Sequence, residues 1–224
     1  MVGGIPVHYR GGGENVVASY DYSDIAEGTG IKAFYALVVT GAGGANANIL
    51  SDEPLYSLVI QYALADVSIT TEAYVAYVDE SFNLSPFNLP KIVNGTAYLT
   101  WTSTNQANTD PDQLGYWEII ISKVSGLDVT TVGSVTDTAA STSRSLHLQT
   151  FKIPLTKTHF KKDDILRLTI KGWAKCTETP DTHTRNFYFG TDPQNRDGAN
   201  IKPSTDDPVT TTVTKLYIPF ALDL

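Results

Sequence analysis

The segment spanning residues 146–175 constrains the fold most, because two runs of alternating apolar and polar residues flank a short charged link. The apolar positions are Leu146, Leu148, Phe151, Ile153 and Leu155 in the first run, and Leu166, Leu168 and Ile170 in the second. Alternation in period two indicates strands with one buried face. The link is too short for the crossover that parallel strands need. We therefore expect an antiparallel pair, with Phe160 in the core and residues 161–164 in water.

Similar segments recur along the rest of the chain, separated by turn signals every ten to twenty residues. Expected strands cover residues 31–40, 55–62, 67–78, 96–103, 116–125 and 209–222, with weaker ones near Val129 to Val135 and Phe187 to Phe189. Residues 41–48 and 104–115 are expected loops, Asn94-Gly95 is an expected turn, and Pro219 predicts an edge or a bulge. No amphipathic helix and no long repeat is found. The sequence thus predicts an all-β fold, a single antiparallel β-sandwich with a jelly-roll-like arrangement.

The first 30 residues differ from this pattern. They are rich in glycine and show no sustained periodicity. We expect an extended N-terminal arm over residues 1–30, followed by one β-sandwich domain over residues 31–224. The arm carries apolar side chains suited to docking on its own sheet or on a neighbouring subunit, namely Val16, Val17, Tyr20, Tyr22 and Ile25.

Composition excludes several classes of partner. The formal net charge is −8 with scattered cations, which argues against nucleic acid and anionic membranes, because phosphate binding needs clustered Lys and Arg. The longest apolar run, residues 33–39, is too short to span a bilayer, and no signal segment precedes it. The single cysteine, Cys176, excludes an internal disulfide. We expect a soluble chain made in the cytoplasm and held together by packing.

No motif for chemistry is complete. Asp192, Asn195 and Asp197 precede Gly198 and faintly resemble a calcium loop, but they fail the EF-hand register, and turn chemistry explains them equally well. The four histidines show no metal-ligand spacing, and no nucleophile elbow occurs. These patterns therefore give no positive indication of a cofactor or of a catalytic site.

The tryptophans raise a separate question about carbohydrate binding. Trp101, Trp117 and Trp173 could stack on sugars, but all three lie inside expected strands. Core packing is the ordinary position of an indole in a strand. We therefore expect these three side chains in the core.

Three segments resemble a known class of protein. They are YDYSDIAEGTGIKAFYA at residues 20–36, FKIPLTKTHFKKDDILRLTIKG at residues 151–172 and KLYIPFALDL at residues 215–224. Together they resemble β-sandwich, jelly-roll-like virion structural proteins of tailed viruses, the proteins that decorate or cement capsids or form part of the tail. The resemblance implies a repetitive assembly role without enzyme activity or cofactor.

The expected function is therefore that of a bacteriophage capsid decoration protein, made in the host cytoplasm and located in the virion. Its expected partners are the major capsid protein or other virion proteins, and further copies of itself in a homo-oligomer, with a trimer favoured. One alternative is a receptor- or glycan-binding module that uses the loops at residues 104–115 and 192–208. Another is a β-sandwich hydrolase or lyase whose catalytic residues are scattered along the chain.

Overall fold

The computed structural model describes residues 29–41, 44–107, 113–137, 147–177, 183–196 and 211–222. Eleven strands and no helix lie in these ranges. The strands are β1 (Thr29–Thr40), β2 (Asn46–Ser51), β3 (Gln61–Ile69), β4 (Val75–Asn83), β5 (Lys91–Ala107), β6 (Gln113–Ser125), β7 (Asp128–Thr136), β8 (His147–Phe160), β9 (Ile165–Cys176), β10 (His183–Gly190) and β11 (Lys215–Leu222). The expectation of an all-β chain is confirmed.

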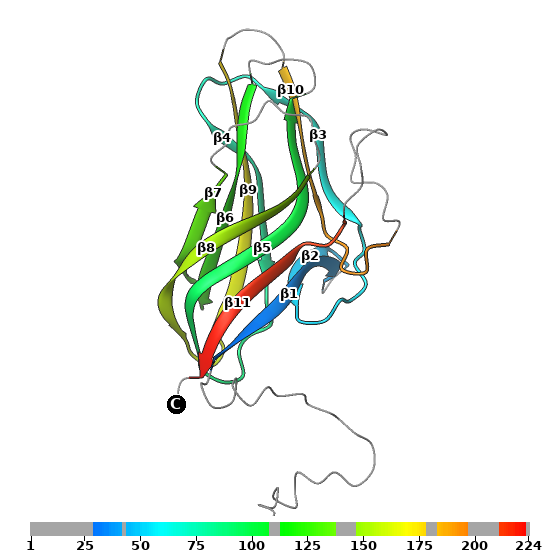
Figure 1. Cartoon of the computed structure of the whole chain (residues 1–224). Coiled ribbons are helices and arrows are strands. Elements are labelled where there is room, and N and C mark those ends of the chain that lie inside the picture. Colours follow the sequence, from blue (N-terminus) through cyan, green and yellow to red (C-terminus); the bar gives the residue numbers. More distant parts are fainter. Residues whose placement is uncertain are drawn as a thin grey trace, which may run out of the picture.

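The strands form two facing layers (Figure 1). The front layer holds β8, β5, β11, β1 and β2, and β10 and β3 continue it alongside the upper part of β5. The back layer holds β4, β9, β6 and β7. Pairing is antiparallel, apart from one parallel bridge between Ile49 of β2 and Asn83 of β4 that links the layers. The last strand, β11, lies inside the front layer between β1 and β5.

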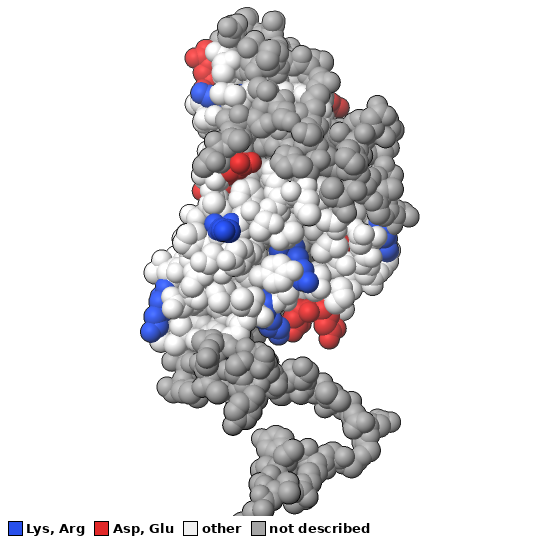
Figure 2. Space-filling model, viewed as in Figure 1, with Lys and Arg blue, Asp and Glu red and all other residues white. Residues whose placement is uncertain are grey.

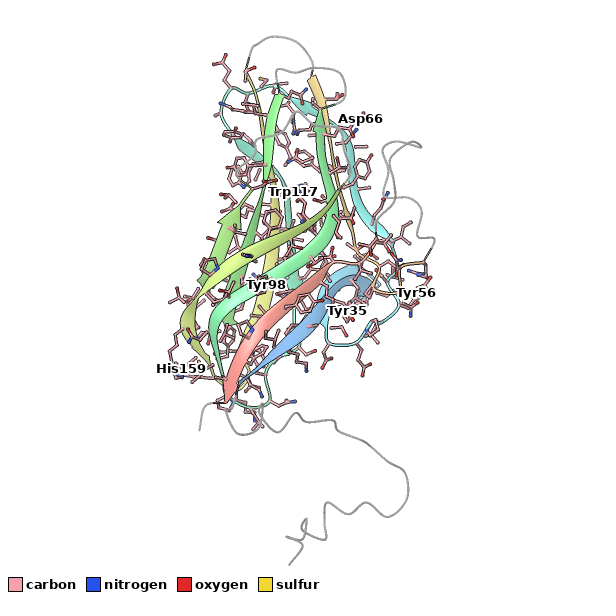
Figure 3. The ribbon with its side chains drawn as sticks, in the orientation of Figure 1. Tyr35, Tyr56, Asp66, Tyr98, Trp117 and His159 are labelled. Atoms are coloured by element: carbon pink, nitrogen blue, oxygen red, sulfur yellow. The ribbon has the colours of Figure 1, made fainter. Side chains whose placement is uncertain are left out.

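An aromatic cluster fills the space between the layers. Trp101 of β5 and Trp117 of β6 are buried and meet edge to face, with ring centroids 5.1 Å apart. Phe187 of β10 packs on Trp117 at 5.7 Å, and Figure 3 shows Trp117 between the layers. Gly172 makes room for this contact, because a Cβ there would lie 2.7 Å from the Phe187 ring. The two tryptophans therefore occupy the core positions that the sequence predicts.

The expected pairing of the two strands in residues 146–175 is wrong. Strand β8 pairs with β5 in the front layer, whereas β9 pairs with β4 and β6 in the back layer. The link between them turns a corner from one layer to the other. A short link and two amphipathic strands are compatible with a hairpin in one sheet and with a corner between two layers. In a hairpin the apolar faces lie side by side, and at a corner they meet across the core.

The corner itself differs from expectation at one residue. Phe160 is fully buried, as predicted. Asp164 is also buried rather than exposed to water. Its carboxylate accepts a hydrogen bond of 2.7 Å from the Lys161 backbone N–H and lies 3.5 Å from Lys123 Nζ. These contacts outweigh burial and lower the pKa of Asp164 below its usual value.

Several other expectations also differ from the structure. The expected strand at residues 55–62 is irregular up to residue 60, since β3 begins at Gln61, and the two ends of the expected loop at residues 104–115 lie in β5 and β6. Asn94-Gly95 is not a hairpin turn: it lies inside β5, where the register shifts and Gly95 has a φ of 108°. Such a bulge uses the same left-handed glycine as a turn. Strand β2 lies partly within the expected loop at residues 41–48 and forms an antiparallel hairpin with β1, in which Thr40 lies opposite Asn46. Pro219 does mark a bulge in β11, as predicted.

The predicted arm lies outside the described residues except for its last two positions, since β1 begins at Thr29. The division into an arm and one domain therefore stays a prediction. Within the residues described, no helix is long and apolar enough to cross a membrane.

Candidate binding surfaces

The turn after β10 contains two of the predicted calcium candidates. Asp192 is buried, and its carboxylate accepts hydrogen bonds from the Arg196 backbone N–H at 2.7 Å and from Arg196 Nε at 3.2 Å. The Asn195 side-chain oxygen accepts a hydrogen bond of 2.8 Å from the Thr212 N–H. Asp197 lies outside the described residues. The structure thus brings Asp192 and Asn195 into one turn, where both contact protein groups. No group of three metal-ligating side chains occurs among the described residues, and calcium binding stays a prediction.

Arg196 also orders a neighbouring segment that we call the apolar loop, which lies between β2 and β3. The loop exposes Leu55, Tyr56, Leu58 and Val59 by 42, 60, 43 and 37%. The Arg196 guanidinium lies 3.9 Å from the centroid of the Tyr56 ring and donates a 2.5 Å hydrogen bond to the Ser57 carbonyl. Figure 3 places Tyr56 on the flank of the molecule. Four apolar side chains are therefore held at the surface, an arrangement that is typical of interaction sites.

The apolar loop leads directly into an edge strand. In the part of the chain that the structure describes, β3 pairs only with β10. No described strand pairs with its other edge, and the strand carries exposed small side chains at Ala63 and Ala65. Asp66, with a φ of 53°, interrupts the strand with a charge. An open edge beside apolar side chains can pair with another extended segment.

Tyr62 ties this edge to the core and predicts a dependence of stability on alkaline pH. Burial, followed by the charge of Glu80, raises the pKa of Tyr62 to about 12, whereas tyrosine titrates near 10 in the unfolded chain. Between these values the folded state holds a proton that the unfolded state has lost. The stability that the protonated Tyr62 hydroxyl contributes below pH 10 should therefore be lost as the pH rises toward 12. Tyr62→Phe should reduce the fall in the urea midpoint between pH 9 and pH 11.

Other groups that titrate in this range remain in both proteins and serve as the background. Tyr116 and Tyr188 have raised pKa values because of burial. Arg185 acts in the opposite direction, since burial lowers its pKa to about 10. An equal fall in Tyr62→Phe and in the unmodified protein would contradict the assignment.

The outer face of the front layer carries tyrosines around one lysine. Lys215 Nζ lies 5.0 Å from the ring centroid of Tyr35 and 5.1 Å from that of Tyr217. Burial opposes the charge, but hydrogen bonds with both tyrosines raise the pKa of Lys215 above its usual value. Tyr98 pairs with Tyr217 across the strands. Figure 2 shows this face as largely uncharged, with separate patches of Lys and Arg.

The outer face of the back layer carries what we call the aromatic strip, formed by Tyr74, Tyr116 and Trp173. The Tyr74 and Tyr116 centroids are 5.0 Å apart, and those of Tyr116 and Trp173 are 6.1 Å apart with planes 14° from parallel. Trp173 Nε1 donates a 2.9 Å hydrogen bond to Glu118 Oε2. The expectation that all three tryptophans lie in the core is therefore wrong for Trp173. Strand alternation gives the reason, since the neighbours Gly172 and Ala174 are buried and the residue between them points outward.

Cys176 and His159 are the described side chains most suited to nucleophilic catalysis, and they do not meet. Cys176 is buried near the upper end of β9, whereas His159 lies at the lower end of β8 (Figure 3). The surfaces above are thus suited to binding through backbone edges and aromatic rings. The aromatic strip was missed from sequence because it combines residues from several strands. The apolar loop was missed because residues 55–62 were expected to form a strand. The outward position of Tyr98, opposite Leu99, follows from local alternation.

Comparisons with known proteins give a fold but no family. No family model matches the sequence, and no curated protein matches it. An α-amino acid ester hydrolase matches at 11% identity with a TM-score of 0.53, over 84% of this chain and 36% of that one. An aminopeptidase from a marine sediment Thaumarchaeota archaeon matches at 8% identity with a TM-score of 0.52, over 86% and 37%. The chain thus spans about a third of these hydrolases, and the likeness shows the fold.

The comparisons bear on two expectations, the absence of enzymatic activity and the resemblance to virion proteins. The prediction of no enzymatic activity is overturned, because two chains that share the fold with TM-scores above 0.5 are described as an ester hydrolase and an aminopeptidase. A viral protein, the VP2 subviral particle of infectious bursal disease virus, also matches, at 12% identity over 84% of this chain and 46% of that one. Its TM-score of 0.32 is too low to support an argument. The link to tailed viruses rests on the sequence resemblance.

Proposed function

We propose that this chain is an assembly module of a virion, a capsid decoration protein that binds the shell and its own copies. The open edge of β3 beside the exposed apolar loop carries the proposal. Side chains that are exposed in one copy would become buried in the assembly. The net charge of −8 suits an outer surface of a particle, since a surface facing packaged genome is expected to be basic.

The segment that pairs with this edge would be the arm of a neighbouring copy. Residues 1–28 precede β1 and include the apolar residues Val16, Val17, Tyr20, Tyr22 and Ile25. Main-chain hydrogen bonds to β3 would provide affinity, and side-chain contacts with the apolar loop would provide specificity. Repetition of this contact around a symmetry axis would close a ring such as a trimer.

Light scattering across a concentration series tests this arrangement. The full chain should form an oligomer, and removal of residues 1–28 should reduce it to a monomer with unchanged β-type circular dichroism. Ala65→Lys should act in the same way, because a charge on an open edge opposes pairing. Ala73→Lys, at an exposed position outside any strand, is the matched control. An oligomer that persists in both the truncated chain and Ala65→Lys would refute the proposal. Normal binding of the truncated chain or of Ala65→Lys to capsids of the same virus would also refute it.

The hydrolase neighbours favour a second candidate function, that the chain acts as part of a hydrolase. The matched proteins are described as an ester hydrolase and an aminopeptidase. The purified chain should then hydrolyse a p-nitrophenyl ester or an aminoacyl p-nitroanilide faster than a heat-inactivated sample does. No turnover of either substrate would count against this candidate.

A further inference from the structure

The aromatic strip lies on an outer face with ordered polar groups. The β9 residues Trp173, Lys171 and Thr169 form successive cross-strand rows with β4 and β6. Lys171 Nζ lies 3.3 Å from Asp79 Oδ2, and Thr169 Oγ1 lies 2.8 Å from Ser81 Oγ. The Lys171 and Asp79 side chains thus lie one row from Trp173, and the Thr169 and Ser81 hydroxyls lie two rows from it.

The orientation of the strip is fixed before any ligand arrives. The hydrogen bond from Trp173 Nε1 to Glu118 holds the indole, and Tyr116 stacks nearly parallel to it. Lys175 Nζ lies 4.9 Å from the centroid of the Tyr74 ring and holds the other end of the strip. A surface whose side chains are already ordered loses less conformational entropy on binding.

The charges on this face indicate the class of ligand. Two carboxylates, Asp79 and Glu118, lie among two ammonium groups, Lys171 and Lys175, so these four groups together carry no net charge. A strongly charged polymer would gain little there. A neutral ligand with apolar ring faces and many hydroxyl groups would stack on the aromatic rings and exchange hydrogen bonds with the paired polar groups.

From this geometry we propose that the outer face of β9 and β6 is a binding site for a neutral polysaccharide, with Trp173 and Tyr116 as the stacking platform and Glu118 as a hydroxyl acceptor. The site lies on the back layer and uses none of the loops at residues 104–115 and 192–208. It is also separate from the β3 edge, so failure of either proposal leaves the other standing.

Affinity electrophoresis of the full chain in gels containing barley β-glucan, laminarin, galactomannan or xylan tests the site. At least one polysaccharide should retard the chain, and retardation should persist in 0.5 M NaCl because a neutral ligand carries no charge for salt to screen. Trp173→Ala should weaken the interaction at least tenfold. Tyr98→Ala, a partly buried tyrosine on the outer face of the other layer, is the matched control and should migrate like the unmodified chain.

Tryptophan fluorescence keeps the proposal testable if Trp173→Ala does not fold. Trp101 and Trp117 are buried, so Trp173 is the indole among the described residues that a surface ligand can reach. The retarding polysaccharide should change the emission of the unmodified chain and leave that of Trp173→Phe unchanged. Retardation by none of the four polysaccharides, equal retardation of Trp173→Ala, or an equal emission change in Trp173→Phe would overturn the proposal.

Discussion

Gly190→Ala is expected to destabilise the fold by about 3 kcal/mol, the upper range for an overpacked core position. Gly190 ends β10, and the backbone of Thr212 passes directly over it, so that an added Cβ would lie 2.7 Å from Thr212 Cα. The Thr214 hydroxyl donates a 2.6 Å hydrogen bond to the Gly190 carbonyl, and the Asp192 N–H donates to the Thr212 carbonyl at 3.0 Å. The obstacle is backbone held at several points, so it cannot rotate away as a side chain could.

Urea unfolding followed by tryptophan fluorescence measures the effect, and Gly30→Ala is the matched control. Gly30 lies in β1, and a Cβ added there meets nothing within 4 Å. That variant should stay within about 0.5 kcal/mol of the unmodified chain. If the two alanine variants are equally stable, the close approach at Gly190 is not a feature of the molecule in solution.

Arg185→Ala is expected to cost about 3–5 kcal/mol, through a cavity and through buried carbonyl groups that lose their donor. The Arg185 side chain is fully buried and bridges the two layers. Its guanidinium donates to the side-chain oxygen of Asn105 and, at 2.7 Å, to the Asn105 carbonyl in β5; it also donates to the Gln113 carbonyl in β6 at 3.4 Å. Gly115 leaves the space for it, since a Cβ there would lie 2.6 Å from Arg185 Nε.

Arg185→Met separates volume from hydrogen bonding. Methionine fills much of the space and removes a charge whose burial is unfavourable, as the lowered pKa of Arg185 indicates. This variant should therefore lose less stability than Arg185→Ala in the same urea experiment. Loss of less than about 1 kcal/mol in Arg185→Ala would show that the bridge contributes little.

Sequence periodicity predicted the features that depend on neighbouring residues. The alternation of Tyr98 and Thr100 with Leu99 and Trp101 placed the two faces of β5 correctly. Phe160, the one apolar residue of the charged link, was also placed in the core correctly. These predictions succeeded because the side-chain period of a strand is a local property of the backbone.

Pairing between distant segments was not predictable in this way. The charged link before β9 fits a hairpin and a corner equally well, and only the partners β5 and β4 decide between them. Trp173 was assigned to the core by residue type, although the alternation of β9 places it on the face opposite Leu168 and Ile170. The aromatic strip and the Arg185 bridge likewise join strands that are far apart in sequence. Partner choice thus limited these predictions.

The position of β11 has a consequence for how the molecule is made. The first described strand and the last are neighbours, with Thr29 paired to Ala221 and Leu216 paired to both Phe34 and Leu99. The front layer therefore cannot close until residue 222 has left the ribosome. Contacts between residues this far apart give the fold a high contact order, and such folds form slowly. Until then β1 and β5 have unpaired edges, so the nascent chain is exposed to misassociation during synthesis.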